Sequence, residues 1–110
     1  MGEILLEGLH DHIGLWSLLW HFQELPDPAV RRRETMALVE ELLGQGWFEV
    51  GFPTSDGRGF EPWNSAPDVS IARINKEWDA LGQEPNIGEI VWFNLTSNGE
   101  MEARRHVARA

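Results

Sequence analysis

Cysteine is absent from this chain of 110 residues. Its absence excludes disulfide bonds, thiolate metal sites and catalysis by a cysteine nucleophile. Small secreted domains commonly depend on disulfides for stability, so a cysteine-free chain of this size is typical of a cytoplasmic protein. We therefore expect a cytoplasmic location.

Long hydrophobic runs are missing as well. The longest apolar stretch, residues 13–22, is interrupted by Gly14, Ser17 and His21, and it is too short to cross a bilayer. The first residues lack the basic region and the apolar core of a signal peptide. We expect neither a secretion signal nor a membrane partner.

Positive charge is scarce, since 9 Lys and Arg oppose 18 Asp and Glu and give a formal net charge of −9. Lys76 is the single lysine, and the arginines gather at residues 31–33 and 104–109. A chain with this balance repels a polyanion on average. The charge favours a protein partner, in particular a basic one, and argues against nucleic acid.

Catalytic and metal-binding motifs are also missing. The sequence has no Gly-x-Ser-x-Gly elbow, no phosphate loop ending in Gly-Lys-Ser or Gly-Lys-Thr, and no His-Glu-x-x-His pair. Metal-capable side chains do occur near the N-terminus, at Glu7, His10, Asp11, His12 and His21. Their spacing does not bring them to one face of a helix. We expect a protein that is not an enzyme and binds neither a cofactor nor a metal.

Aromatic residues are abundant, with six Trp and five Phe but no Tyr. Hydrophobic residues make up 42% and charged residues 25%, which is a globular composition. Aromatic side chains can supply much of the energy of a small core. The length predicts one domain over residues 1–110, with flexible ends at 1–9 and 107–110.

Apolar periodicity predicts three main helices, over residues 11–23, 28–44 and 68–81. The first would begin at Asp11 as N-cap, and it is apolar on nearly all sides. Such a helix lies at the centre of a core or meets a partner, so a homodimer through this helix is a further hypothesis.

The other two helices carry clearer start and stop signals. Asp27-Pro28 begins the second helix and glycines at 44 and 46 end it. In the third, residues 71, 74, 78 and 81 form one apolar face and Gly82 supplies the C-terminal cap.

Strands are predicted over residues 47–52, 90–96 and 100–106. The last two would form a C-terminal β-hairpin that turns at Ser97-Asn98-Gly99, because Asn and Gly tolerate positive φ. Residues 53–67 are predicted as a long loop. The resulting fold class is α+β, with three main helices and a small antiparallel sheet.

The run Val91-Trp92-Phe93-Asn94-Leu95-Thr96-Ser97-Asn98-Gly99-Glu100 resembles the wing of a winged-helix domain. Residues 68–81 stand where that family has its recognition helix, and the resemblance spans residues 28–106. It implies a winged-helix-like fold and a regulator of transcription that binds DNA. The residues that would contact DNA under this resemblance are Arg73, Lys76, Asn98, Arg104 and Arg105.

The favoured hypothesis is a non-enzymatic, acidic protein-interaction module, such as an immunity or antitoxin factor or a regulatory factor. Two groups of side chains are candidates for partner contact. The first is the basic cluster of Arg31, Arg32 and Arg33, and the second is the pair of loop aromatics Phe60 and Trp63.

A third hypothesis starts from the tryptophans. A pocket lined by Trp16, Trp20, Trp63 and Trp92 would bind a small molecule. The alternative is that these side chains simply fill an aromatic core.

Overall fold

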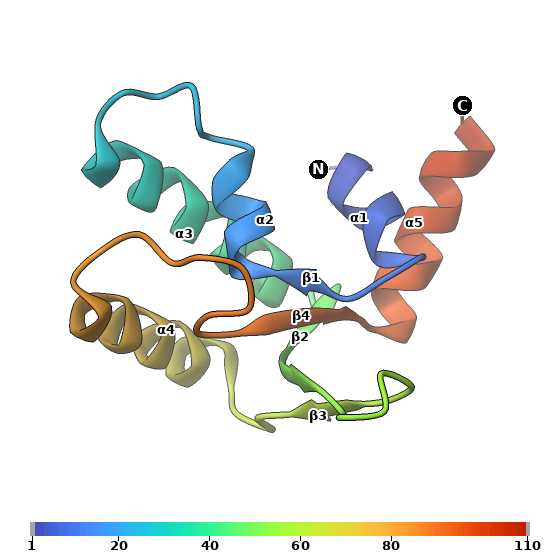
Figure 1. Cartoon of the computed structure of the whole chain (residues 1–110). Helices are drawn as coiled ribbons and strands as arrows, with labels where there is room; N and C mark the ends of the chain where they lie inside the picture. The colour runs from blue at the N-terminus through green and yellow to red at the C-terminus, as the bar shows by residue number, and fades with distance from the viewer. Residues whose placement is uncertain (1, 110) are drawn as a thin grey trace.

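The computed structural model describes residues 2–109, which form five helices and one sheet of four strands (Figure 1). The helices are α1 (Gly2–Gly8), α2 (Leu15–Trp20), α3 (Pro28–Gly44), α4 (Pro67–Leu81) and α5 (Ser97–Arg109). The strands are β1 (Ile13–Gly14), β2 (Phe48–Pro53), β3 (Phe60–Pro62) and β4 (Trp92–Leu95). The predicted α+β class with a small antiparallel sheet is confirmed. Met1 and Ala110, which belong to the predicted flexible ends, lie outside the described residues.

The sheet has the order β1-β4-β2-β3, and every neighbouring pair is antiparallel. Strand β4 is one of the two interior strands, and its Phe93 pairs with Ile13 on one side and with Val50 on the other. Phe93 is fully buried, as is Ile74 of α4. The core therefore lies between the sheet and the helices that pack on it, while α1 and α5 lie side by side at one end (Figure 1).

Helices α3 and α4 confirm the second and third predicted helices. The Asp27 carboxylate accepts a hydrogen bond of 2.9 Å from the Ala29 N–H and caps α3, with Pro28 in the first turn. Helix α4 ends at Gly82, whose φ of +72° is the left-handed conformation that favours glycine. Local signals were sufficient here because each helix carries its own start and stop residues.

The first predicted helix, residues 11–23, is wrong in its boundaries. Asp11 does not cap a helix, because its carboxylate accepts from the neighbouring His12 N–H and the chain then enters strand β1. Helix α2 begins only at Leu15 and ends at Trp20. Pairing of Ile13 and Gly14 with the distant strand β4 overrides the helical pattern of the segment.

The predicted C-terminal hairpin at Ser97-Asn98-Gly99 is also wrong, because this segment begins helix α5. The Thr96 hydroxyl accepts a hydrogen bond of 3.0 Å from the Gly99 N–H, as an N-cap side chain does. Ion pairs one turn apart, such as Glu100 with Arg104, then support the helix. The wing that carried the winged-helix resemblance is therefore a strand followed by a helix.

Two further segments differ from the prediction. The loop over residues 53–67 contains strand β3, which pairs antiparallel with β2. Residues 2–8, expected to belong to a flexible end, form α1, and its Ile4 and Leu5 are buried in the core. No helix in the described part of the chain is both long and apolar enough to pass through a membrane.

Candidate functional site

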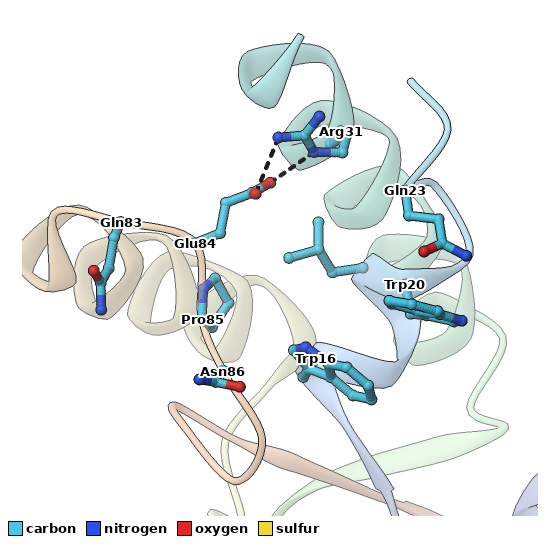
Figure 2. A pocket seen from close by; sticks show the side chains of 9 residues that line it. Trp16, Trp20, Gln23, Arg31, Gln83, Glu84, Pro85 and Asn86 are labelled. Atoms are coloured by element: carbon cyan, nitrogen blue, oxygen red, sulfur yellow. Dashed lines mark hydrogen bonds and ion pairs between the residues drawn. The ribbon is translucent and has the colours of Figure 1, made fainter. Parts of the chain in front are cut away.

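An open groove with a volume of about 510 Å³ lies between helix α2 and the segment that follows α4 (Figure 2). Its volume exceeds that of four other cavities formed by the described residues. Its lining residues are Trp16, Leu19, Trp20, Gln23, Arg31, Gln83, Glu84, Pro85 and Asn86. The size is that of a typical ligand site, and the lining combines aromatic rings with amide and charged groups.

The aromatic wall consists of Trp16 and Trp20, which are one helical turn apart on α2. Their ring centroids are 5.4 Å apart and their planes differ by 28°, so the indoles stack (Figure 2). The inward positions of α2 are taken by buried leucines, at residues 15, 18 and 19. Trp20 therefore stays 53% exposed, which is unusual for so large an apolar side chain.

An ion pair closes the opposite end of the groove. The Arg31 guanidinium donates two hydrogen bonds to Glu84, of 2.9 Å and 3.0 Å, and a third of 2.6 Å to the Leu25 carbonyl. The hydrogen bond to Glu84 raises the pKa of Arg31 further above its usual value, so the arginine stays charged. This pair ties α3 to the segment after α4 and holds Glu84 in place beside the groove (Figure 2).

The other two arginines of the predicted basic cluster differ in their surroundings. Arg32 donates a hydrogen bond of 2.7 Å to the Asp79 carboxylate and further hydrogen bonds to Asn75, so it joins α3 to α4. Arg33 is 72% exposed in its side chain and lies 3.8 Å from Glu34. Of the cluster, only Arg31 lines the groove, and Arg33 is the most exposed of the three.

The predicted loop aromatics Phe60 and Trp63 lie outside the groove. Phe60 is in strand β3 and its ring lies 5.1 Å from that of His12. Trp63 packs against the core, its backbone N–H donates to the Val50 carbonyl, and the Arg73 guanidinium lies 3.7 Å above its ring. Both aromatics hold their segment against the body of the protein.

The residues expected to contact DNA do not form one surface. Arg73 and Lys76 are on α4, whereas Asn98, Arg104 and Arg105 are on α5, and Figure 1 shows these helices at opposite ends of the sheet. The arginines of α5 are also paired within their own helix, Arg104 with Glu100 at 2.8 Å and Arg105 with Glu102 at 2.9 Å.

Of the four tryptophans of the predicted pocket, the structure brings Trp16 and Trp20 together and leaves the other two apart. Trp92 lies in the central strand, where its ring packs beside Gly14. The polar members of the groove, above all Glu84 and Asn86, were missed because the sequence shows that segment only as a turn. The described residues contain no group of three His, Cys, Asp or Glu that could hold a metal ion.

A second, smaller cavity of about 230 Å³ lies between β2 and the start of α4. Ser70 lines it and is buried, and its hydroxyl has no hydrogen-bond partner among the described residues. A cavity of this size has room for ordered water, which is the usual partner of such a group. The larger groove is therefore the stronger candidate for function.

Comparisons of the chain with protein-family models, with curated proteins and with solved structures find no match. A functional inference for this protein therefore depends on the chemistry of the groove and on the distribution of charge.

Proposed function

We propose that this protein is a non-enzymatic protein-interaction module that docks a basic protein partner on the groove of Trp16 and Trp20. The observation that carries the proposal is the half-exposed, stacked Trp20 at the edge of a groove of about 510 Å³. Tryptophan is enriched among the few residues that dominate the binding energy of protein interfaces. A rigid aromatic pair beside a concavity is the form that such an anchor takes.

The distribution of charge supports a basic partner. Six arginines each form an ion pair with a carboxylate of this chain, at residues 31, 32, 33, 73, 104 and 105. Each pair also neutralises one carboxylate, so the carboxylates outside these pairs outnumber the remaining bases and carry the net charge of −9. Complementary charge speeds the encounter of two proteins and suppresses wrong partners.

Size and charge narrow the kind of role that we propose. We propose that this small acidic domain covers a basic surface of an enzyme in the cytoplasm. Such a role is that of an immunity or antitoxin factor, or of a regulatory factor. The proposal needs no catalytic group from this chain, and its affinity would come from the groove.

The test is a quantitative capture experiment from a lysate of the source organism. Wild-type protein, Trp20→Ala and Phe52→Ala are immobilised in equal amounts, and the retained proteins are compared by mass spectrometry. Phe52 is the matched control because it is an aromatic residue that is 40% exposed and lies outside the groove. We expect a basic protein retained by wild type and Phe52→Ala and lost with Trp20→Ala. Retention profiles that do not differ between the three would contradict the proposal.

A second candidate function is supported by the volume of the groove. About 510 Å³ lies within the range of small-molecule sites, and the amides of Gln23, Gln83 and Asn86 can fix a polar ligand. Screening a metabolite collection by tryptophan fluorescence and thermal shift tests this candidate. A hit should stabilise wild type and leave Trp20→Ala unchanged.

A further inference from the structure

The pairing between β2 and β3 ends before β2 does. The Trp63 N–H donates a hydrogen bond of 2.9 Å to the Val50 carbonyl, and among the described residues it is the last bond along that edge. The next residue, Asn64, has a φ of 56°, a left-handed conformation that interrupts an extended strand. The chain then turns towards α4 (Figure 1). In the described structure, residues 48 and 49 of β2 therefore have no neighbouring strand on this side.

Phe48 presents its backbone groups to this unpaired edge. Alternate residues of an antiparallel strand direct their N–H and carbonyl groups to opposite edges. The Trp47 carbonyl accepts from the Thr96 N–H, so residue 47 faces β4. Phe48 therefore faces the same side as Val50, and within residues 2–109 neither its N–H nor its carbonyl has a hydrogen-bond partner. Folded proteins normally satisfy such a buried pair of backbone groups.

The cavity of about 230 Å³ lies along this edge. Its lining includes three consecutive residues of β2, at positions 48, 49 and 50. Because successive side chains of a strand point to opposite faces, a cavity that touches all three borders the backbone edge. Pro62 and Pro67 also line this β2-edge cavity, and neither has an N–H to donate to the Phe48 carbonyl.

The Ser70 hydroxyl is a second polar group without a partner in the β2-edge cavity. Ser70 is on α4 and is only 1% exposed, and its hydroxyl makes no hydrogen bond with the described residues. A helical serine often donates to the carbonyl four residues earlier, but the Ala66 carbonyl accepts the Ser70 N–H instead, at 3.0 Å. A ligand that bonds to this hydroxyl removes the cost of leaving it unpaired.

The charge of the cavity favours a neutral ligand. Among the described residues that line it, Glu49 alone carries a charge, and its carboxylate accepts a hydrogen bond of 2.7 Å from the Asn94 side-chain amide. An anion, such as the free C-terminus of a peptide, meets a carboxylate here and no base. The neutral main chain within a peptide meets no such repulsion.

We propose that the β2-edge cavity binds one extended residue of a peptide, which pairs with Phe48 and adds to the edge of β2. The N–H of that residue donates to the Phe48 carbonyl, and its carbonyl accepts from the Phe48 N–H. The Ser70 hydroxyl bonds to the adjoining peptide group. The register of β2 and β3 places the bound residue where residue 65 would stand if β3 continued. Addition of an extended peptide to an unpaired sheet edge is an established mode of recognition.

The volume limits what can enter. At about 30 Å³ for each water-sized unit, a cavity of about 230 Å³ holds on the order of eight such units. It therefore accommodates one residue with a small side chain, such as alanine, and no bulky one. The site goes beyond the proposed function, because it shares no lining residue with the groove of Trp16 and Trp20.

The test titrates two small ligands into ¹⁵N-labelled protein. One is N-acetyl-alanine N-methylamide, and the other is acetyl-lactic acid N-methylamide, in which an ester oxygen replaces the alanine N–H. We expect the alanine ligand to shift the backbone signals of residues 48–50 and 64–70 and to slow hydrogen exchange of the Phe48 N–H. The ester should bind about three- to tenfold more weakly, because it has no donor for the Phe48 carbonyl.

Two serine variants locate the contact with α4. Ser70→Ala should weaken binding of the alanine ligand about threefold and should not lower stability in urea, because it removes an unpaired hydroxyl. Ser17→Ala is the matched control, since Ser17 is also helical but lies outside the cavity, and it should bind as wild type does. The ¹⁵N spectrum of each variant shows whether it is folded.

Three results would overturn the inference. The first is equal binding of the alanine ligand and its ester, a comparison that needs no variant. The second is an absence of shifts at about 50 mM ligand, well above the millimolar affinity expected of so small a molecule, which would mean that water alone fills the cavity. The third is a set of shifts confined to other parts of the protein.

This titration and the capture experiment fail independently. Trp20→Ala should bind the alanine ligand as wild type does, and loss of binding in that variant would place the ligand in the groove and overturn the inference. If capture depends on Trp20 but the alanine ligand has no advantage over its ester, the proposed function stands and the edge site falls. If the alanine ligand binds selectively but no captured protein depends on Trp20, the edge site stands and the proposed function falls.

Discussion

Two glycines allow close backbone packing in this fold because they have no side chain. A Cβ on Gly99 would lie 2.1 Å from the Trp47 carbonyl oxygen, and one on Gly51 would lie 2.1 Å from the Glu61 carbonyl oxygen. Neither glycine has a positive φ, so its backbone conformation does not require glycine. Glycine is required because the neighbouring backbone leaves no room for a side chain. Both positions bring backbone segments into closer contact than any side chain would allow.

Gly99→Ala should lower the free energy of unfolding by about 1–3 kcal/mol, because the added methyl group meets rigid backbone. Gly44→Ala is the matched control, since a Cβ there meets nothing within 4 Å and the residue ends α3. The control should gain about 0.4–1 kcal/mol through helix propensity and a less flexible unfolded chain. Urea unfolding of both variants measures the two changes, and equal signs would contradict the packing that is described for Gly99.

This glycine also shows why the end of the chain was mispredicted. Asn98-Gly99 is a strong signal for a hairpin turn when only neighbouring residues are considered. The contact that decides the matter is with Trp47, about fifty residues earlier in the chain, and it is not visible in the local pattern. Thr96, a residue type that favours the N-cap position, was the local signal that could have favoured the helix.

The turn between β2 and β3 gives a prediction about pH. The Thr54 hydroxyl and then the Arg58 N–H donate to the Asp56 carboxylate and lower its pKa. Because the folded pKa is depressed, the carboxylate stabilises the fold above its usual pKa of about 4, and this contribution is lost as the pH falls through the folded value. Thr54→Val should raise the pKa of Asp56 towards its usual value, and Thr54→Ser should keep it low. NMR titration of the carboxyl carbon measures the shift, and an unchanged pKa in Thr54→Val would argue against the hydroxyl as its cause.

At the scale of elements, the helices with internal signals were predictable and the short strands were not. Helix α3 has Asp27 and Pro28 at its start, and α4 has Gly82 at its end, so local chemistry sufficed. Strand β1 is two residues long and β3 is three, and each exists only because a distant strand supplies its hydrogen bonds. No periodicity can be detected in segments of that length.

The junction between β4 and α5 depends on Thr96. Its hydroxyl accepts from the Gly99 N–H and donates to the Gly46 carbonyl, so it caps the helix and fastens it to the end of α3. Thr96→Ala should lower the free energy of unfolding by about 1–2 kcal/mol. Thr96→Ser retains the hydroxyl and should lose clearly less, as measured by thermal and urea unfolding. An alanine variant as stable as the serine variant would contradict the capping role.

At the scale of the whole molecule, the division between core and groove is the feature that sequence alone could not provide. The groove combines residues 16–31 with residues 83–86, and the two parts meet only because α3 packs on both α2 and α4. Composition shows the excess of aromatic residues. It does not show which of these residues face solvent. Trp16 and Trp20 share the apolar pattern of their buried neighbours, so the pattern could not separate an anchor from a core residue.

Stability measurements separate these two classes of aromatic residue. Phe93→Ala should lower the free energy of unfolding by about 3–5 kcal/mol, because Phe93 is fully buried at the centre of the sheet. Trp20→Ala should change it by about 1 kcal/mol or less, since the side chain is 53% exposed. Both values come from urea unfolding. A large loss in Trp20→Ala would mean that the indole serves the fold and not a partner.

The order β1-β4-β2-β3 has a consequence for synthesis of the chain. Strand β4, residues 92–95, lies between β1 and β2 in the sheet, yet it leaves the ribosome after the other three strands. Until it emerges, β1 has no partner in the sheet and β2 presents an open edge, which can pair with other chains. The sheet therefore cannot close before residues 92–95 have been synthesised, and its strands come together in a step that follows their emergence.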